Sequence, residues 1–126
     1  MIKKILVVDD EPDIVKVIGM RLKASNFEVA TASDGEEALN KISEDKPDLI
    51  IADYMMPKIN GLQLCRMIKS AEEYKDYKDI PIIMLTARTQ IKDISEIMEA
   101  GATTYMHKPF KAEALLGIIN SLHPGE

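Results

Sequence analysis

LIIADYMMP (residues 49–57) is the stretch that decides the fold, because its short apolar run ends on an aspartate and stops soon afterwards at a proline. An ionised carboxylate is costly to bury unless a cation pairs with it. Asp53 must therefore reach solvent at the end of a strand or meet a cation from elsewhere in the chain.

Two similar apolar runs lie on either side of LIIA (49–52): ILVV (5–8) and IIML (82–85). Each run is short, rich in β-branched residues and free of polar alternation. This pattern is typical of strands buried on both faces, as in a parallel sheet covered by helices. FEVATA (27–32) and TTYMHK (103–108) are weaker strand candidates.

Helical patterns separate these runs. Apolar residues spaced by four predict a helix over 12–24, and Asp34 with Glu37 predicts a capping box at the start of another helix. The polar stretch AEEYKDYKD (71–79) is expected to be a solvated loop. The remaining helices are expected over 62–70, 91–100 and 111–122.

Strand and helix therefore alternate along the chain, which implies an α/β fold with a parallel sheet and right-handed crossovers. If the strand order is 2-1-3-4-5, the first and third strands are neighbours. The length of 126 residues is typical of one domain, so we expect residues 1–126 to form a single domain.

Composition excludes several classes of protein. Hydrophobic residues at 46% and charged residues at 29% are ordinary globular values, and a net charge of −5 argues against direct nucleic acid binding. No apolar run approaches the roughly 20 residues of a membrane span. Cys65 is the only cysteine, so no intrachain disulfide can form, and we expect a cytoplasmic protein.

Polar residues follow the expected strands, at the edge where open α/β sheets bind ligands. Each has an ordinary explanation by itself: a helix cap, the end of a strand or a surface lysine. Their presence together at one edge makes coincidence a poor explanation. These residues are Asp9, Asp10, Asp53, Thr86 and Lys108.

The set suits phosphoryl chemistry assisted by a metal. Clustered carboxylates repel one another, and Mg²⁺ relieves that repulsion while typically using one or two carboxylates and a phosphate oxygen. Asp53 and Asp10 fit as ligands, with Asp9 orienting a metal-bound water. Lys108 and Thr86 can both donate hydrogen bonds to a phosphate. Carboxylates also act as nucleophiles that form aspartyl phosphates.

The motifs VVDDEP (7–12), DYMMP and NG (within 53–61), LTA (85–87) and YMHKPF (105–110) resemble, in order, the receiver domain of two-component response regulators. The resemblance covers essentially the whole chain. It implies a flavodoxin-like sandwich with a five-stranded parallel sheet flanked by five helices, in a single-domain form similar to chemotaxis regulators.

The resemblance also implies the chemistry of the site. Asp53 would be the phospho-acceptor, receiving its phosphate from a sensor histidine kinase or a phosphotransfer protein. Asp9, Asp10, Asp53 and the backbone carbonyl of Met55 would hold Mg²⁺. The chain would be no enzyme beyond catalysing its own phosphorylation and dephosphorylation.

Switching is implied by the same resemblance. Thr86 and Lys108 would contact the phosphoryl group, and the movement of Thr86 would vacate space for Tyr105 to turn inward. The switched surface, 91–122, would then control a downstream protein. The alternative for Tyr105 is a half-buried aromatic of an edge strand with no switching role. The Lys108–Pro109 bond is similar to one that is cis in the family.

Met55 and Arg88 stand where members of the family tune the lifetime of the phosphate. A bulky apolar residue and a long cation at the rim could hinder the attacking water, so we expect slow autodephosphorylation. The alternative is that neither residue has a special effect.

Two other functions remain open. The chain could be a receiver from a longer regulator with a DNA-binding or enzymatic output. It could also be a Mg²⁺-dependent phosphohydrolase with an aspartyl nucleophile. Such phosphohydrolases usually carry a second Asp two residues after the nucleophile, where this chain has Met55.

Overall fold

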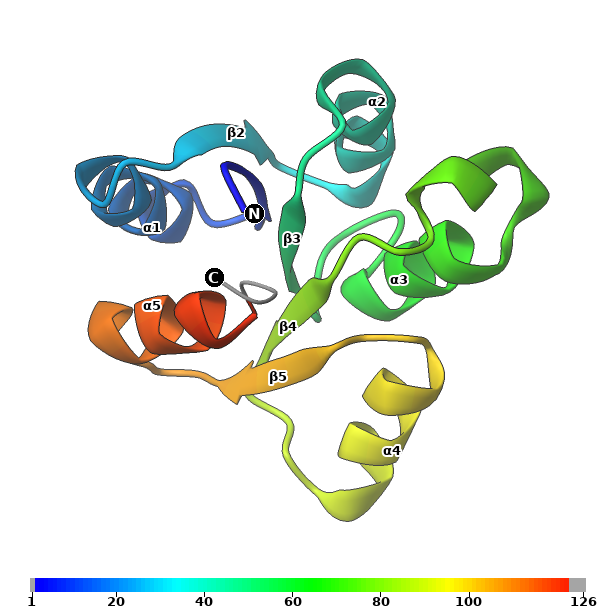
Figure 1. Ribbon diagram of the computed structural model, residues 1–126. Coiled ribbons are helices and arrows are strands. Elements are labelled where there is room, and N and C mark those ends of the chain that lie inside the picture. The colour runs from blue at the N-terminus through cyan, green and yellow to red at the C-terminus, as the bar shows by residue number, and fades with distance from the viewer. Residues whose placement is uncertain (1, 123–126) are drawn as a thin grey trace.

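A parallel sheet of five strands runs through the middle of the molecule in the order β2-β1-β3-β4-β5 (Figure 1). The computed structural model describes residues 2–122. The predicted parallel sheet and its strand order are both confirmed. The strands are β1 (Lys4–Val8), β2 (Glu28–Ala32), β3 (Leu49–Asp53), β4 (Ile82–Thr86) and β5 (Thr104–His107).

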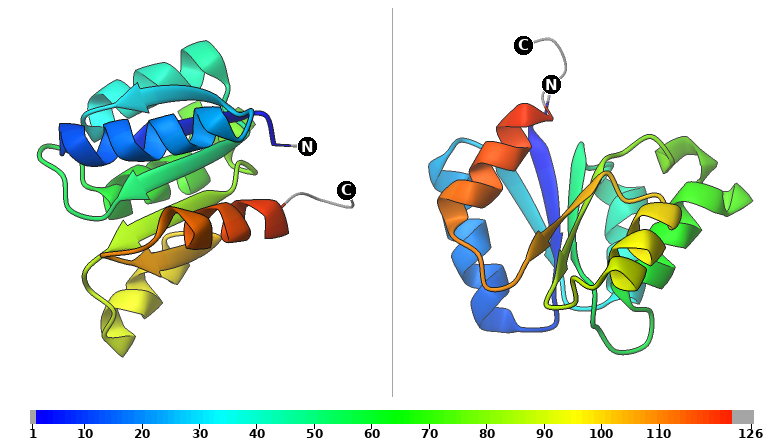
Figure 2. Two further views of the ribbon diagram at one scale, coloured as in Figure 1. Left: turned by 90° about the vertical axis from the view of Figure 1, so that its left-hand side faces the viewer. Right: turned by 90° about the horizontal axis from the view of Figure 1, so that it is seen from below.

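Helices cover both faces of the sheet, α1 and α5 on one side and α2, α3 and α4 on the other (Figures 1 and 2). None of the helices in residues 2–122 is long and apolar enough to cross a membrane. The helices are α1 (Pro12–Ala24), α2 (Gly35–Asp45), α3 (Gly61–Ser70), α4 (Ile91–Glu99) and α5 (Ala112–Ser121), with a short 3₁₀ helix η1 (Glu72–Tyr77).

The central strands lack polar alternation because both of their faces are buried. In β1, Leu6 and Val8 join the apolar cluster under α2, α3 and α4, while Ile5 and Val7 join the cluster under α1 and α5. All residues of β3 and β4 are buried as well. Removing this much apolar surface from water, at about 25 cal/mol per Å², is the main force that holds the three layers together.

The prediction of a loop over 71–79 is wrong, because η1 forms within this stretch. Tyr74 and Tyr77 pack against the cluster under α3, which gives the polar segment an apolar anchor. Lys69 of α3 holds the residues that follow η1, because its Nζ donates hydrogen bonds to the carbonyls of Lys78 and Ile80.

Side-chain caps begin two helices of the same layer. Asp34 accepts a hydrogen bond from the Glu37 N–H at 2.8 Å, as predicted, but the Glu37 carboxylate binds the Ser33 N–H and so does not complete the box. A complete capping box occurs at α3, where Asn60 and Gln63 each bind the other's backbone N–H at 2.8 and 2.9 Å. The capping box at α3 fixes where the loop after β3 must end.

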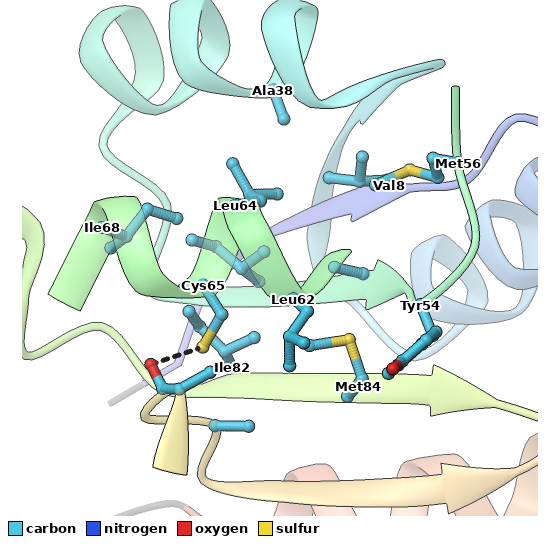
Figure 3. Packing of buried hydrophobic residues seen from close by; sticks show 14 of the residues in the cluster. Val8, Ala38, Tyr54, Met56, Leu62, Leu64, Cys65, Ile68, Ile82 and Met84 are labelled. Atoms are coloured by element: carbon cyan, nitrogen blue, oxygen red, sulfur yellow. Dashed lines mark hydrogen bonds between the residues drawn. The ribbon is translucent and has the colours of Figure 1, made fainter. Parts of the chain in front are cut away.

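Cys65 joins α3 to the end of α4. Its thiol is buried among the residues of Figure 3 and donates a hydrogen bond to the Ala100 carbonyl at 3.3 Å. Burial raises the pKa of the Cys65 thiol to about 11. Cys65 therefore serves packing on the inward side of α3.

Candidate functional site

The carboxyl edge of the sheet brings the predicted site residues together. Asp9 and Asp10 follow β1, Asp53 ends β3, and these strands are neighbours with Val8 paired to Ala52. Lys108 follows β5, and its N–H donates to the Thr86 carbonyl at the end of β4. The site thus lies where the strand order reverses, which is the usual ligand position of such sheets.

Lys108 is the cation that pairs with Asp53. Its Nζ donates hydrogen bonds to Asp53 Oδ1 at 2.9 Å and to Asp9 Oδ2 at 3.2 Å. The Asp9 side chain has no exposed surface, and that of Asp53 is 7% exposed. An unpaired charge buried this deeply would be strongly destabilising, so Lys108 is what allows β3 to end on a carboxylate.

The pKa values of this pair record both burial and pairing. Burial raises the pKa of Asp53, and the hydrogen bond from Lys108 only partly offsets this. Burial by itself would lower the pKa of Lys108, but the hydrogen bond and charge of Asp53, followed by those of Asp9, outweigh it and raise that pKa. Lys108 therefore stays protonated at neutral pH, yet it neutralises only part of the acidic cluster.

The acidic cluster could hold a metal ion. One carboxylate oxygen from each of Asp9, Asp10, Glu11 and Asp53 lies within 4.8 Å of the others. Oxygen donors at this spacing fit a hard divalent cation. Glu11 is not among the residues predicted from the sequence, although it is the next carboxylate after Asp10 in VVDDEP.

Asp10 follows β1 but does not cap α1. Glu11 is the N-cap residue of α1, and its own side chain makes no capping hydrogen bond. The Glu11 N–H is bound by Asp9 Oδ1 at 2.9 Å instead. Asp10 is exposed and so remains available to a cation.

Thr86 lies at the predicted edge, but its hydroxyl bonds locally. It accepts a hydrogen bond from the Arg88 N–H at 2.8 Å and donates one to the Arg88 carbonyl at 3.1 Å. The Thr86 side chain is almost fully buried. The Thr86 O–H must therefore leave the Arg88 carbonyl before it can donate to a group on Asp53.

Tyr105 is half buried on β5, where it pairs with Met84 and packs against the cluster on the α4 side of the sheet. This placement is compatible with a switch role and also with the plain structural alternative. The Lys108–Pro109 bond is cis, as the resemblance implied.

The loop after β3 is held at several points. The Gly61 N–H donates to the Tyr54 carbonyl at 3.1 Å, and a Cβ on Gly61 would collide with the Asp53 carbonyl, so only glycine fits there. Met56 is buried near Val8 (Figure 3), whereas the Met55 side chain is 55% exposed. The loop is thus held on both sides of Met55, whose own side chain is mostly exposed.

Comparison with known proteins defines the class. Residues 5–120 match the family described as the response regulator receiver domain, and the chain belongs to this family. The solved structure of the Vibrio cholerae chemotaxis protein CheY4 superposes with a TM-score of 0.87 at 35% identity, covering 96% of this chain and 98% of that one. Family membership and the flavodoxin-like fold are thus confirmed.

Curated relatives are longer regulators. The alkaline phosphatase synthesis transcriptional regulatory protein PhoP of Bacillus subtilis is 46% identical over 110 residues, which are 87% of this chain and 44% of PhoP. The DNA-binding response regulator MtrA of Mycolicibacterium smegmatis is 36% identical over 121 residues, which are 96% of this chain and 50% of MtrA. The chain therefore spans about half the length of these relatives.

Proposed function

We propose that this receiver domain is a phosphate-operated switch in which Asp53 is the phospho-acceptor. The observation that carries the proposal is the pairing of the buried Asp53 carboxylate with Lys108 inside an acidic cluster. Receiver domains interact with histidine kinases or phosphotransfer proteins and with downstream targets. For this chain the phosphate donor would be the phosphohistidine of a kinase or phosphotransfer protein in the reducing cytoplasm.

In the transfer step, an Asp53 Oδ atom attacks the phosphorus of the phosphohistidine. The new O–P bond forms as the N–P bond breaks, and the electron pair returns to the imidazole nitrogen, which takes up a proton. Mg²⁺ bound by Asp9, Asp10, Asp53 and the Met55 carbonyl would neutralise charge on the transferring group. Lys108 Nζ, already bonded to Asp53, would donate to a phosphoryl oxygen.

Phosphorylation would add roughly −1.5 to −2 charges and strong acceptor oxygens beside Thr86. Thr86 would then donate its O–H to the phosphoryl group in place of the Arg88 carbonyl, and Tyr105 would turn into the space left behind. The surface formed by 91–122 would change its packing and bind a partner. Such a change is a population shift between two packings of one fold.

The test is the intact mass of the protein after incubation with acetyl phosphate, with and without Mg²⁺. We expect a phosphate-sized gain that requires Mg²⁺ and is absent from Asp53→Asn. Asp76→Asn, which changes an exposed aspartate in η1, is the matched control and should be phosphorylated like the parent. No gain in the parent would overturn the proposal.

A second candidate concerns only the output. The relatives named as transcriptional or DNA-binding regulators are matched over 44% and 50% of their lengths, which favours a receiver that works within a longer regulator. The reading frame of the natural gene after the codon for Glu126 decides between a receiver that acts alone and one that works within a longer regulator. No comparable observation favours the phosphohydrolase, and steady multiple turnover of a phosphate ester would be needed to revive it.

A further inference from the structure

The structure points to a contact that opposes switching: we propose that Arg88, held against the ring of Tyr54, keeps Thr86 in the bonds that it makes in this structure. We call this contact the Tyr54–Arg88 clamp. The inference rests on the proposed function, because it concerns the residue that would move toward a phosphoryl group on Asp53. Tyr54 and Arg88 are positioning residues here, since they act through Thr86.

The first part of the clamp is the turn that follows β4. The Thr86 hydroxyl binds both the N–H and the carbonyl of Arg88, at 2.8 and 3.1 Å. Hydroxyl bonds to the backbone two residues ahead stabilise turns locally. Because both bonds go to Arg88, the position of the Arg88 backbone decides whether the Thr86 hydroxyl stays in these two bonds.

The second part is the anchor. The guanidinium carbon of Arg88 lies 5.9 Å from the centre of the Tyr54 ring, within the range of a cation–π contact. The Arg88 side chain thus reaches from the turn to the residue that directly follows Asp53. Without this contact, an exposed arginine would have no fixed position.

Tyr54 is a rigid anchor. Its N–H donates to the Leu85 carbonyl at 2.8 Å, and its carbonyl accepts from the Gly61 N–H at 3.1 Å. Its side chain is 7% exposed and belongs to the cluster that includes Met84 (Figure 3). Both ends of the clamp therefore rest on the carboxyl edge of the sheet, one on β3 and the other on β4.

The direction of the effect follows from the competition for Thr86. The Thr86 O–H must leave the Arg88 carbonyl before it can donate to a phosphoryl group, so any contact that stabilises the turn with Arg88 disfavours the switched state. A cation–π contact at an exposed site changes such an equilibrium by about two- to fivefold. The clamp would therefore lower the apparent affinity for a phosphoryl mimic by about this factor.

A direct electrostatic role of Arg88 predicts the opposite result. A guanidinium at the rim would attract a phosphoryl group, so its removal would weaken binding of an anionic mimic. The electrostatic effect of Arg88 would also be independent of Tyr54. The sign of the change and its dependence on Tyr54 therefore separate the two explanations.

The experiment measures the affinity of beryllofluoride, a mimic of the aspartyl phosphate, by calorimetry in the presence of Mg²⁺. The variants are Arg88→Gln, Tyr54→Leu and the double variant. Tyr54→Phe keeps an aromatic face, and Arg66→Gln removes an exposed arginine on α3, outside the site and outside the surface 91–122. In the free proteins, hydrogen exchange of the Arg88 amide reports opening of the turn directly.

We expect Arg88→Gln and Tyr54→Leu each to tighten beryllofluoride binding about two- to fivefold and to speed exchange of the Arg88 amide. Because the two residues act through one contact, the double variant should gain no more than either single one. Tyr54→Phe and Arg66→Gln should resemble the parent.

Beryllofluoride binding that is unchanged or weaker in Arg88→Gln would overturn the clamp. So would a change in affinity on Arg88→Gln that is equally large in the Tyr54→Leu background. Arg88→Gln changes an exposed side chain, so the answer does not depend on whether Tyr54→Leu folds. A parent that fails to bind beryllofluoride with Mg²⁺ would instead overturn the proposed phospho-acceptor function.

Discussion

A buried carboxylate that is only partly neutralised costs stability, and Asp53 is such a group. Lys108 is shared between Asp53 and Asp9, so a single ammonium serves two buried acids. The raised pKa of Asp53, caused first by burial and then by Asp9 and Asp10 against the opposing effect of Lys108, reflects this shortage of positive charge. The same shortage is what a bound cation would relieve.

The raised pKa of Asp53 makes a pH prediction. A group whose pKa is raised on folding stabilises the native state most below its unfolded pKa, about 3.9 for Asp, and this contribution is lost as pH rises through the folded pKa. Asn at this position cannot ionise. The stability of Asp53→Asn relative to the parent should therefore increase as pH rises from below 4 toward 7.

Urea denaturation of both proteins without Mg²⁺, at several pH values, measures this difference. Asp76→Asn is the control at an exposed aspartate and should show no such trend. A difference in free energy of unfolding that is constant with pH would show that the Asp53 carboxylate costs the fold nothing.

Met55 supports a second prediction at this scale, that the aspartyl phosphate is long-lived. Its exposed side chain lies two residues after Asp53, where we expect it to hinder an attacking water. We expect a half-life of minutes or longer with Mg²⁺, shortened by Met55→Ala. Loss of ³²P-label over time after removal of the donor measures it, and a half-life of seconds in the parent would contradict the prediction.

At the scale of elements, the loop between β3 and α3 is braced against the start of α2. A Cβ on Gly35 would lie 2.6 Å from both the Cβ and the carbonyl oxygen of Ile59, so the loop can approach α2 only because residue 35 is glycine. Ion pairs from Lys58 to Asp34 and Glu36, at 3.8 and 3.9 Å, flank this contact but are exposed and contribute little.

Gly35→Ala should therefore weaken Mg²⁺ binding, because displacement of Ile59 moves the loop that carries the Met55 carbonyl. We expect the dissociation constant for Mg²⁺ to rise at least fivefold, about 1 kcal/mol, in calorimetric titration with the metal alone. Gly117→Ala is the matched control, since a Cβ there meets nothing within 4 Å. Equal Mg²⁺ affinity of the parent and Gly35→Ala would show that α2 does not position the site.

The same elements show what the sequence could and could not predict. The central strands were predictable because burial on both faces leaves an unbroken apolar run, as in LIIA and IIML. The helical conformation of η1 could not be predicted in the same way. It depends on Tyr74 and Tyr77, which pack against a cluster assembled from distant segments.

The site divides in a similar way. Its five polar residues were predictable because parallel strands end at one edge, which needs only the order of elements. The sharing of Lys108 between two carboxylates and the bonds of Thr86 to Arg88 depend on side-chain geometry within a few ångströms. No periodicity or spacing in the sequence records that geometry.

For the whole molecule, the cluster couples metal binding to folding. The acids of the cluster come from the turn between β1 and α1 and from the end of β3, so Asp53 joins the other three only in the folded chain. A ligand that binds only the native state stabilises it by about 2.7 kcal/mol at 100 times its dissociation constant. Mg²⁺ at that concentration should raise the free energy of unfolding of the parent by this amount.

Urea denaturation with increasing MgCl₂, at constant ionic strength, tests this coupling. Asp10→Asn keeps the pair of Asp53 with Lys108 but removes one exposed ligand, so its stability should depend much less on Mg²⁺. Asp76→Asn should respond like the parent. An equal response of all three proteins would assign the effect of Mg²⁺ to general screening of a chain with net charge −5, and the acidic cluster would lose its claim to be a metal site.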